Sequence, residues 1–147
     1  MEKTVFLYAD DNKDDRFLVR RAFEKVAPEI DLQTASSGSG VMAYLKGDGE
    51  FANRAVYPKP SVLLLDFRLP PTSALEVVRW VRQQPGFGQL IIVCFSGSTS
   101  PTEVHAAYAF GVNSFIEKVA TLPELESKIK CMCNYWIECC VLPATDL

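Results

Sequence analysis

Short apolar runs of strand length alternate with segments of helical periodicity along the chain, and this alternation restricts the fold more than any other feature. The apolar runs cover residues 5–8, 31–35, 62–65, 90–95 and 115–116, and the helical segments cover residues 14–26, 40–45, 73–83, 100–110 and 121–140. This pattern predicts an α/β domain with a parallel sheet that helices cover on both faces. The 147 residues are a common size for one domain, so we expect a single domain over residues 1–147.

Helix start signals support three of these segments. Ser73, Ser100 and Thr121 each precede a glutamate by three residues, which is the spacing of a capping box. Pro101 at a first helical position and Gly111 just after the last apolar residue are the expected limits of the segment between them. We therefore expect helices to begin at each of the three hydroxyl residues.

The composition disfavours several classes of protein. A formal net charge of −3 argues against a nucleic-acid binder, because such domains carry clustered basic residues. The apolar stretch before Asp10 is too short for a signal peptide core or for a membrane span. We therefore expect a cytoplasmic protein that binds neither nucleic acid nor membrane.

Four of the five cysteines lie close together near the carboxyl end, which raises the question of a zinc site. They are Cys131, Cys133, Cys139 and Cys140, all within the last expected helix. They form no paired C-x-x-C motif, and no histidine is near them. We expect reduced thiols that pack as small apolar side chains.

Polar side chains follow the apolar runs at the points where the strands are expected to end. Asp10 and Asp11 follow the first run, Asp66 the third, Ser96 the fourth and Lys118 the fifth. Taken singly, each side chain could simply cap a helix or a turn, or lie in solvent. In an open parallel sheet, however, ligands bind beyond the carboxyl ends of the strands, so these side chains are expected to converge.

Three converging carboxylates repel one another unless a cation lies among them. Oxygen ligands select a hard ion, and Mg²⁺ needs only a few carboxylates together with water. A carboxylate beside Mg²⁺ can attack phosphorus, while an ammonium and a hydroxyl bind the phosphoryl oxygens. Asp66, Lys118 and Ser96 fit these three roles.

The motifs "DDNKDD", "PSVLLLDFRLP", "VCFSGS" and "GVNSFIEK" resemble, in order, those of the receiver domain of bacterial two-component response regulators. The resemblance covers nearly the whole chain. It implies a flavodoxin-like (βα)5 three-layer sandwich whose parallel strands lie in the order 2-1-3-4-5. It also implies a signalling protein that is not an enzyme, beyond Mg²⁺-dependent self-phosphorylation and self-dephosphorylation.

The same resemblance implies roles for single residues. A histidine kinase is implied to phosphorylate Asp66, and Lys118 to grip the phosphoryl group. Ser96 and the aromatic Phe115 are implied to form the switch pair. The implied magnesium ligands are carboxylates and one backbone carbonyl, namely Asp11, Asp66, the carbonyl of Arg68 and, usually through water, Asp10.

The loop "DGEFANR" and the ending "YWIECCVLP" resemble more narrowly the single-domain regulators that partner bacterial phytochromes. This narrower resemblance implies a phytochrome-type sensor histidine kinase as the partner. Because we find no second domain, we expect the output to be contact with a downstream protein.

The chain departs from the family pattern at two positions near the expected site. The family's usual Lys-Pro is Lys118-Val119 here, and we expect a trans bond because a cis bond before a residue other than proline is unfavourable. Arg68 lies two residues after the expected acceptor. Its guanidinium is expected either to pair with Asp10 or Asp11 when metal is absent or to point into solvent.

Three other functions compete with this interpretation. A flavin or nucleotide binder of the same fold needs a phosphate-binding loop after the first strand, where "ADDNKDD" is strongly acidic. A phosphatase with an aspartyl-phosphate intermediate usually carries a second carboxylate where this chain has Arg68. A pseudo-receiver that binds partners without being phosphorylated stays open as the alternative.

The last expected helix has more apolar residues than one core-facing stripe requires. Leu122, Leu125, Ile129, Met132, Trp136 and Cys139 recur at a helical period, and Cys133 and Tyr135 widen the face. We predict a homodimer or a kinase-dependent interface that uses this helix, the fourth helix and the fifth strand. Alternatively, residues 46–60 or the last residues of the chain cover this face.

Overall fold

A computed structural model of the protein, which describes residues 3–145, shows a parallel sheet of five strands in the order β2-β1-β3-β4-β5. The strands are β1 (Val5–Ala9), β2 (Asp31–Ala35), β3 (Val62–Asp66), β4 (Ile91–Ser96) and β5 (Ser114–Glu117). The predicted strand order and flavodoxin-like architecture are confirmed.

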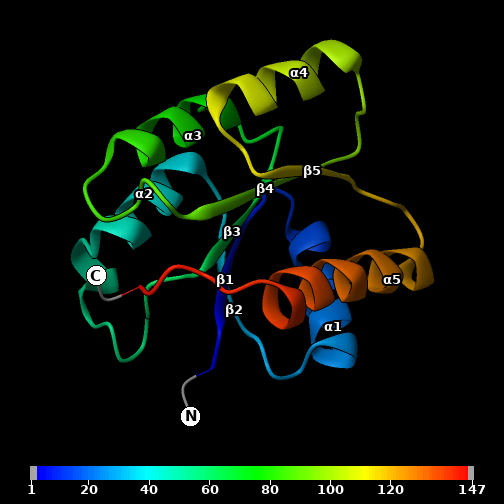
Figure 1. Ribbon diagram of the computed structural model, residues 1–147, viewed down its shortest axis with the longest axis horizontal. Helices are drawn as coiled ribbons and strands as arrows, with labels where there is room; N and C mark the ends of the chain where they lie inside the picture. The colour runs from blue at the N-terminus through cyan, green and yellow to red at the C-terminus, as the bar shows by residue number, and fades with distance from the viewer. Residues whose placement is uncertain (1–2, 146–147) are drawn as a thin grey trace.

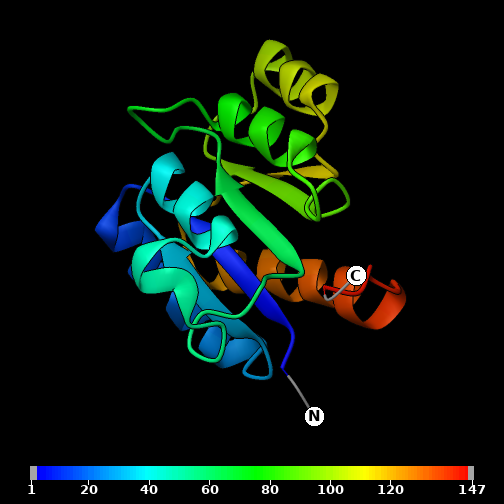
Figure 2. The same ribbon diagram turned by 90° about the vertical axis from the view of Figure 1, so that its left-hand side faces the viewer.

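Helices cover both faces of the sheet, so the molecule has three layers (Figure 1). The helices are α1 (Lys13–Val26), α2 (Gly38–Lys46), α3 (Ala74–Gln83), α4 (Pro101–Phe110) and α5 (Leu122–Cys133). Figure 2 shows α2, α3 and α4 on one side of the sheet, with α1 and α5 on the other. Within residues 3–145, no helix has both the length and the apolar character needed to cross a membrane.

The three central strands are buried along their whole length, which explains their almost uniformly apolar sequences. Side chains alternate between the two faces of a strand, so each strand supplies both apolar cores. In β3, Leu63 and Leu65 pack beneath α2 and α3, whereas Val62 and Leu64 pack beneath α1 and α5. The rigid centre of the sheet therefore fixes where Asp66, the last residue of β3, emerges.

The predicted helix starts agree with the structure, but only one of the three predicted hydroxyl caps forms. Ser73 Oγ accepts a hydrogen bond from Leu75 N at 3.2 Å. Ser100 and Thr121 occupy the capping positions without accepting from the helix backbone, and Thr121 Oγ1 instead donates to Glu124 Oε1 at 2.9 Å. Gly111 ends α4 with a φ of 113°, a left-handed conformation that favours glycine.

The carboxyl-terminal helix differs from the single helix predicted over residues 121–140. The α-helix ends at Cys133, and one wider π-helical segment follows over Asn134–Cys139. Trp136, Ile137 and Leu142 are partly buried against the core beneath α1 and α5, so part of the wide apolar face is accounted for by contact with the core. Tyr135 is 55% exposed, so another part stays open.

Arg82, in the last turn of α3, ties together three segments that position β5. Its guanidinium donates to the carbonyl oxygens of Leu90 at 2.7 Å and of Gly111 at 2.7 Å. It also donates to Asn113 Oδ1 at 2.9 Å, and the same oxygen accepts from Ile92 N at 2.8 Å. This network anchors the chain immediately before β5 and so helps to place Lys118, the first residue after β5.

We predict that Arg82→Ala lowers the free energy of unfolding by about 2–4 kcal/mol, because several half-buried carbonyl oxygens lose their donor at once. Chemical denaturation measures this change. Arg79→Ala, which removes an exposed arginine from the same helix, serves as the control and is expected to cost less than about 0.5 kcal/mol. Equal losses in the two variants would show that the Arg82 network does not stabilise the fold.

Candidate functional site: a carboxylate and lysine cluster at the strand ends

Parallel pairing brings the predicted site residues to one edge of the sheet. Asp10 and Asp11 follow β1, Asp66 ends β3, Ser96 ends β4 and Lys118 follows β5. The pairing of β1 with β3, of β3 with β4 and of β4 with β5 aligns these strand ends. The convergence predicted from the positions of the five residues is therefore confirmed.

The three aspartates form a cluster that could hold a metal ion. Oxygen atoms of Asp10, Asp11 and Asp66 all lie within 4.8 Å of one another. Asp10 and Asp66 are buried and Asp11 is exposed, so the cluster opens to solvent on one side. A set of carboxylate oxygens alone suits a hard divalent cation such as Mg²⁺.

Lys118 supplies positive charge at the centre of the site. Its Nζ lies 2.6 Å from Asp10 Oδ2, 2.8 Å from Asp15 Oδ2 and 3.0 Å from Asp66 Oδ2. Burial favours the neutral amine, but the hydrogen bonds to Asp10 and Asp15 and the charge of Asp66 outweigh it and raise the pKa of Lys118. The peptide bond between Lys118 and Val119 is trans, as predicted. Among residues 3–145, the one cis peptide bond joins Pro70 to Pro71.

Asp10 is the most tightly held carboxylate of the cluster. Its Oδ2 accepts from Tyr8 Oη at 2.5 Å in addition to Lys118, and its Oδ1 accepts from Asn12 N at 2.9 Å. Burial acts to raise the pKa of Asp10, but the hydrogen bonds from Lys118, Tyr8 and Asn12 outweigh it and hold the pKa below its ordinary value. Asp10 is therefore a buried carboxylate in its charged form.

The protein shifts the pKa of Asp66 in the opposite direction to that of Asp10. Asp66 Oδ1 accepts from Arg68 N at 3.0 Å, and Asp66 Oδ2 faces Lys118. Burial, together with the negative charge of Asp10, raises the pKa of Asp66 above its ordinary value despite these two donors. The protein therefore stabilises the charge of Asp66 less than that of Asp10.

Two residues of the site were not predicted from the sequence. Tyr8 belongs to an apolar run, and the only signal for its role is that residues i and i+2 of a strand share a face, which places it beside Asp10. Asp15 lies in the first turn of α1, where an acidic residue is expected for helix stability alone. Its contact with Lys118 depends on how α1 packs beside α5, the helix that follows the lysine.

Ser96 and Phe115, the predicted switch pair, come from neighbouring strands. Ser96 is buried, and its Oγ accepts from Ser98 N at 3.1 Å, while its carbonyl oxygen accepts from Lys118 N at 2.7 Å. The half-buried ring of Phe115 packs against Phe67, with ring centroids 6.0 Å apart. Ser96 is thus joined through the backbone to the lysine, and Phe115 contacts the residue after Asp66.

Of the two arrangements expected for Arg68, the structure shows the solvent-exposed one, with an ion pair to Glu103. The arginine does not pair with Asp10 or Asp11; its Nη2 lies 3.1 Å from Glu103 Oε1, in the first turn of α4. The oxygens of Asp10 already accept from Lys118, Tyr8 and Asn12, which leaves the arginine without a role there. The Arg68 side chain is 69% exposed, so this pair contributes little to stability.

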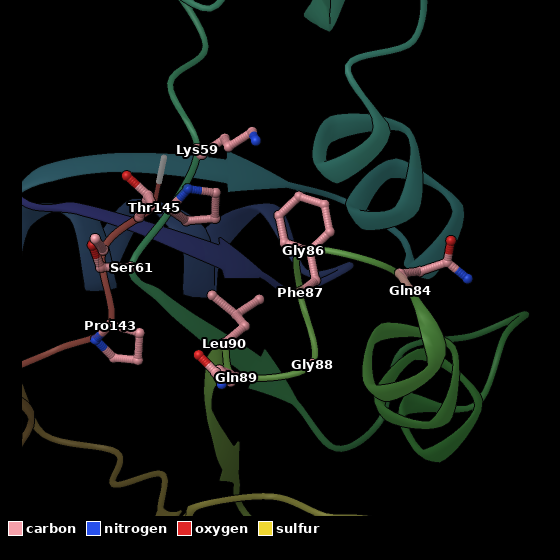
Figure 3. A pocket seen from close by; sticks show the side chains of 12 residues that line it. Lys59, Ser61, Gln84, Gly86, Phe87, Gly88, Gln89, Leu90, Pro143 and Thr145 are labelled. Carbon is pink, nitrogen blue, oxygen red and sulfur yellow. The ribbon is translucent and has the colours of Figure 1, made fainter. Parts of the chain in front are cut away.

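A large cavity lies elsewhere, at the opposite edge of the sheet (Figure 3). It has a volume of about 620 Å³ and is lined by residues that precede β3 and β4 and by the segment from Pro143 to Thr145. Lys59 lies over the Phe87 ring there, 5.8 Å from its centroid. None of the clustered aspartates lines this cavity, so the chemistry of the site does not depend on it.

The doubly wound parallel sheet and the acidic cluster at its strand ends define the class as a flavodoxin-like domain with a carboxylate and lysine site. Comparison with known families then gives the assignment. The pattern of the family described as response regulator receiver domain matches residues 6–130. The chain belongs to this family.

Response regulator Rcp1 of Synechocystis sp. is 29% identical over 140 residues, which cover 95% of this chain and 93% of that protein. The solved Mn²⁺-bound form of Rcp1 has a TM-score of 0.84, and the match covers 96% of this chain and 99% of that structure. A response regulator in red light signalling of R. palustris is 28% identical with a TM-score of 0.91, over 96% of this chain and 99% of that one. The phosphorylated cyanobacterial phytochrome response regulator RcpA is 28% identical with a TM-score of 0.88, over 97% and 100% of the two chains.

We predict that Asp66→Asn stabilises the protein at pH 7 without divalent metal, by about 1 kcal/mol in urea denaturation with a chelator present. The folded protein raises the pKa of Asp66, so stability falls as the pH rises through that pKa, and the substitution removes this loss. The gain is expected to shrink in acid, where the wild-type carboxyl is protonated. Asp48→Asn, at an exposed position, is the control; a wild type as stable as Asp66→Asn at pH 7 contradicts the prediction.

Proposed function

We propose that this response regulator accepts a phosphoryl group on Asp66 from a histidine kinase and signals by contact with another protein. The observation that carries the proposal is the position of the Asp66 carboxylate between the lysine ammonium at 3.0 Å and the other two aspartates. Asp66 also has the raised pKa that marks a weakly stabilised, nucleophilic carboxylate. We further propose that residues 1–147 act as one receiver domain.

In the proposed reaction, a carboxylate oxygen of Asp66 forms a bond to phosphorus as the bond from phosphorus to the donor nitrogen of a kinase histidine breaks. The transferred group brings additional negative charge into an acidic site. The ammonium of Lys118 is close enough to bind one of its oxygens, and the Ser96 hydroxyl is expected to bind another after a change of rotamer. The electron pair of the broken bond stays on the histidine nitrogen, which takes up a proton, so the histidine leaves as neutral imidazole.

The residues present fit a divalent cation, for which we propose Mg²⁺. Its proposed ligands are oxygen atoms of Asp11 and Asp66 and the backbone carbonyl of Arg68, with Asp10 bound through water. This division agrees with the hydrogen bonds, since both oxygens of Asp10 already accept from protein donors whereas Asp11 is exposed. When bound, the ion supplies positive charge that neutralises the phosphoryl oxygens. The Mn²⁺-bound form of Rcp1 supports a divalent metal of this kind.

We propose a phytochrome-type sensor histidine kinase as the partner. The support is the likeness to RcpA, described as a phytochrome response regulator, and to the regulator of red light signalling. Both matches cover nearly the whole of this chain. The identity of the downstream protein does not follow from these likenesses.

We also propose that two copies of the chain associate through α4, β5 and α5. Tyr108 on α4 and Tyr135 after α5 are 48% and 55% exposed, so both rings are accessible to a partner. A groove of about 510 Å³ lies between β5 and α5 and is lined by Phe115, Met132 and Tyr135 among others. Phosphorylation at the nearby strand ends would act on this surface through Ser96 and Phe115.

We predict that the wild type, incubated with Mg²⁺ and acetyl phosphate or with a cognate kinase, gains one phosphoryl group by intact mass. Asp66→Asn is expected to gain none, because an amide is not a nucleophile for this reaction. Asp14→Asn, which removes an exposed carboxylate of α1, is expected to be labelled like the wild type. Equal labelling of Asp66→Asn would show that another residue accepts the phosphoryl group, and no labelling of the wild type by any donor would support the pseudo-receiver alternative.

For the proposed interface, we predict that Tyr135→Glu converts a dimer into a monomer in sedimentation velocity with Mg²⁺ and beryllofluoride, because a charge would be buried at the contact. Val56→Glu, at another exposed apolar position, is the control and is expected to leave the dimer intact. A wild type that sediments as a monomer at high concentration, with and without beryllofluoride, rules out this interface.

A further inference from the structure

Tyr8 places a hydroxyl directly beneath the proposed phosphorylation site. It lies in β1, its side chain is completely buried, and its Oη donates to Asp10 Oδ2 at 2.5 Å. Burial raises the pKa of Tyr8 far above its ordinary value, and the hydrogen bond to Asp10 adds to this effect. The hydroxyl therefore keeps its proton and remains a donor at every pH at which the protein works.

Asp10 Oδ2 receives two hydrogen bonds, and the second comes from Lys118 at 2.6 Å. Asp10 has no exposed surface, so bulk solvent does not replace a donor lost at Oδ2. The water proposed to link Asp10 to Mg²⁺ is assigned to Oδ1, which accepts one hydrogen bond, from Asn12 N. A buried carboxylate oxygen without a donor is costly. If one of the two donors moves away, the other is therefore needed to keep Oδ2 hydrogen-bonded.

Lys118 is the donor that has to move. Its ammonium has three N–H groups, and all three already contact carboxylates, those of Asp10, Asp15 and Asp66. A phosphoryl group on Asp66 adds a fourth acceptor with more negative charge than a carboxylate, and it draws the ammonium toward itself. Asp15, with a side chain 38% exposed, can be hydrated when the lysine leaves, whereas Asp10 cannot.

We propose that Tyr8 is a positioning residue for phosphoryl transfer, whose hydroxyl keeps Asp10 Oδ2 hydrogen-bonded while Lys118 moves to a phosphoryl oxygen on Asp66. The proposal rests on the function proposed for Asp66. With phenylalanine at this position, Asp10 Oδ2 depends on Lys118 alone, and the lysine is held back. The phosphorylated state is then disfavoured relative to the free state.

The experiment measures the binding of Mg²⁺ alone, and then of beryllofluoride at saturating Mg²⁺, by isothermal titration calorimetry. Tyr8→Phe is expected to weaken beryllofluoride binding about tenfold, the effect of one hydrogen bond to a charged group. Its affinity for Mg²⁺ is expected to stay within about twofold of the wild type, because Lys118 still contacts Asp10 before the phosphoryl mimic binds.

Tyr44→Phe is the matched control. The Tyr44 hydroxyl is also that of a buried tyrosine, and it donates to the carbonyl oxygen of Pro58 at 2.7 Å, away from the acidic cluster. This variant is expected to bind beryllofluoride like the wild type even if it loses stability. In a Lys118→Met background no ammonium moves, so adding Tyr8→Phe is expected to cause no further loss.

A second readout uses the wild type and does not depend on whether a variant folds. The NMR resonance of the Tyr8 Cζ carbon is expected to shift when beryllofluoride is added to the Mg²⁺-loaded protein, because Tyr8 becomes the sole donor to Asp10 Oδ2. The Cζ resonance of Tyr44 is expected to stay unchanged.

The outcomes separate this inference from the function on which it rests. If the wild type does not bind beryllofluoride at Asp66, both are overturned. If the wild type binds it but Tyr8→Phe binds equally well, or if the Tyr8 resonance does not respond, only the role of Tyr8 is overturned. An equal loss of Mg²⁺ and beryllofluoride affinity also overturns it, because Tyr8 then merely supports the metal site.

Discussion

The structure depends above all on one ammonium group that is shared by three carboxylates. Lys118 contacts Asp10, Asp15 and Asp66 within 3.0 Å, and two of these side chains are buried. Without a cation, the negative charges at this edge of the sheet would repel one another and oppose folding. Lys118 offsets this repulsion, yet it leaves Asp66 with a raised pKa. The negative charge of the folded site is thus only partly neutralised, which favours the binding of a further cation.

The sheet brings these charged side chains together because the strand order places β1, β3, β4 and β5 side by side, with their carboxyl ends at the same edge. Apolar cores on both faces fix the central strands, whereas β5, at the edge, is only partly buried. Its position relies on the Arg82 network before it and on the hydrogen bond from Lys118 N to the Ser96 carbonyl oxygen after it. β5, which leads directly into Lys118, is therefore held less tightly than the three central strands.

The sequence was sufficient to predict the sheet and most of the site, because both depend on patterns along the chain. Apolar runs marked the strands, and the ends of the runs marked Asp10, Asp66 and Lys118. Tyr8 was missed because its spacing from Asp10 indicates a shared strand face but not a hydrogen bond, and Asp15 because its contact depends on helix packing. The contact between Arg68 and Glu103 was not expected for the same reason, since the two residues lie 35 positions apart in the chain. The π-helical end after Cys133 likewise reflects packing rather than periodicity.

The most direct test of this account is a crystal structure of the protein with Mg²⁺ and beryllofluoride bound. The account predicts beryllium on a carboxylate oxygen of Asp66, with Lys118 Nζ within hydrogen-bonding distance of a fluoride and farther from Asp10 Oδ2 than the 2.6 Å of the present structure. A structure with Mg²⁺ bound but no beryllofluoride on Asp66 would contradict it. So would beryllofluoride on Asp66 with Lys118 still bound to all three carboxylates and to no fluoride.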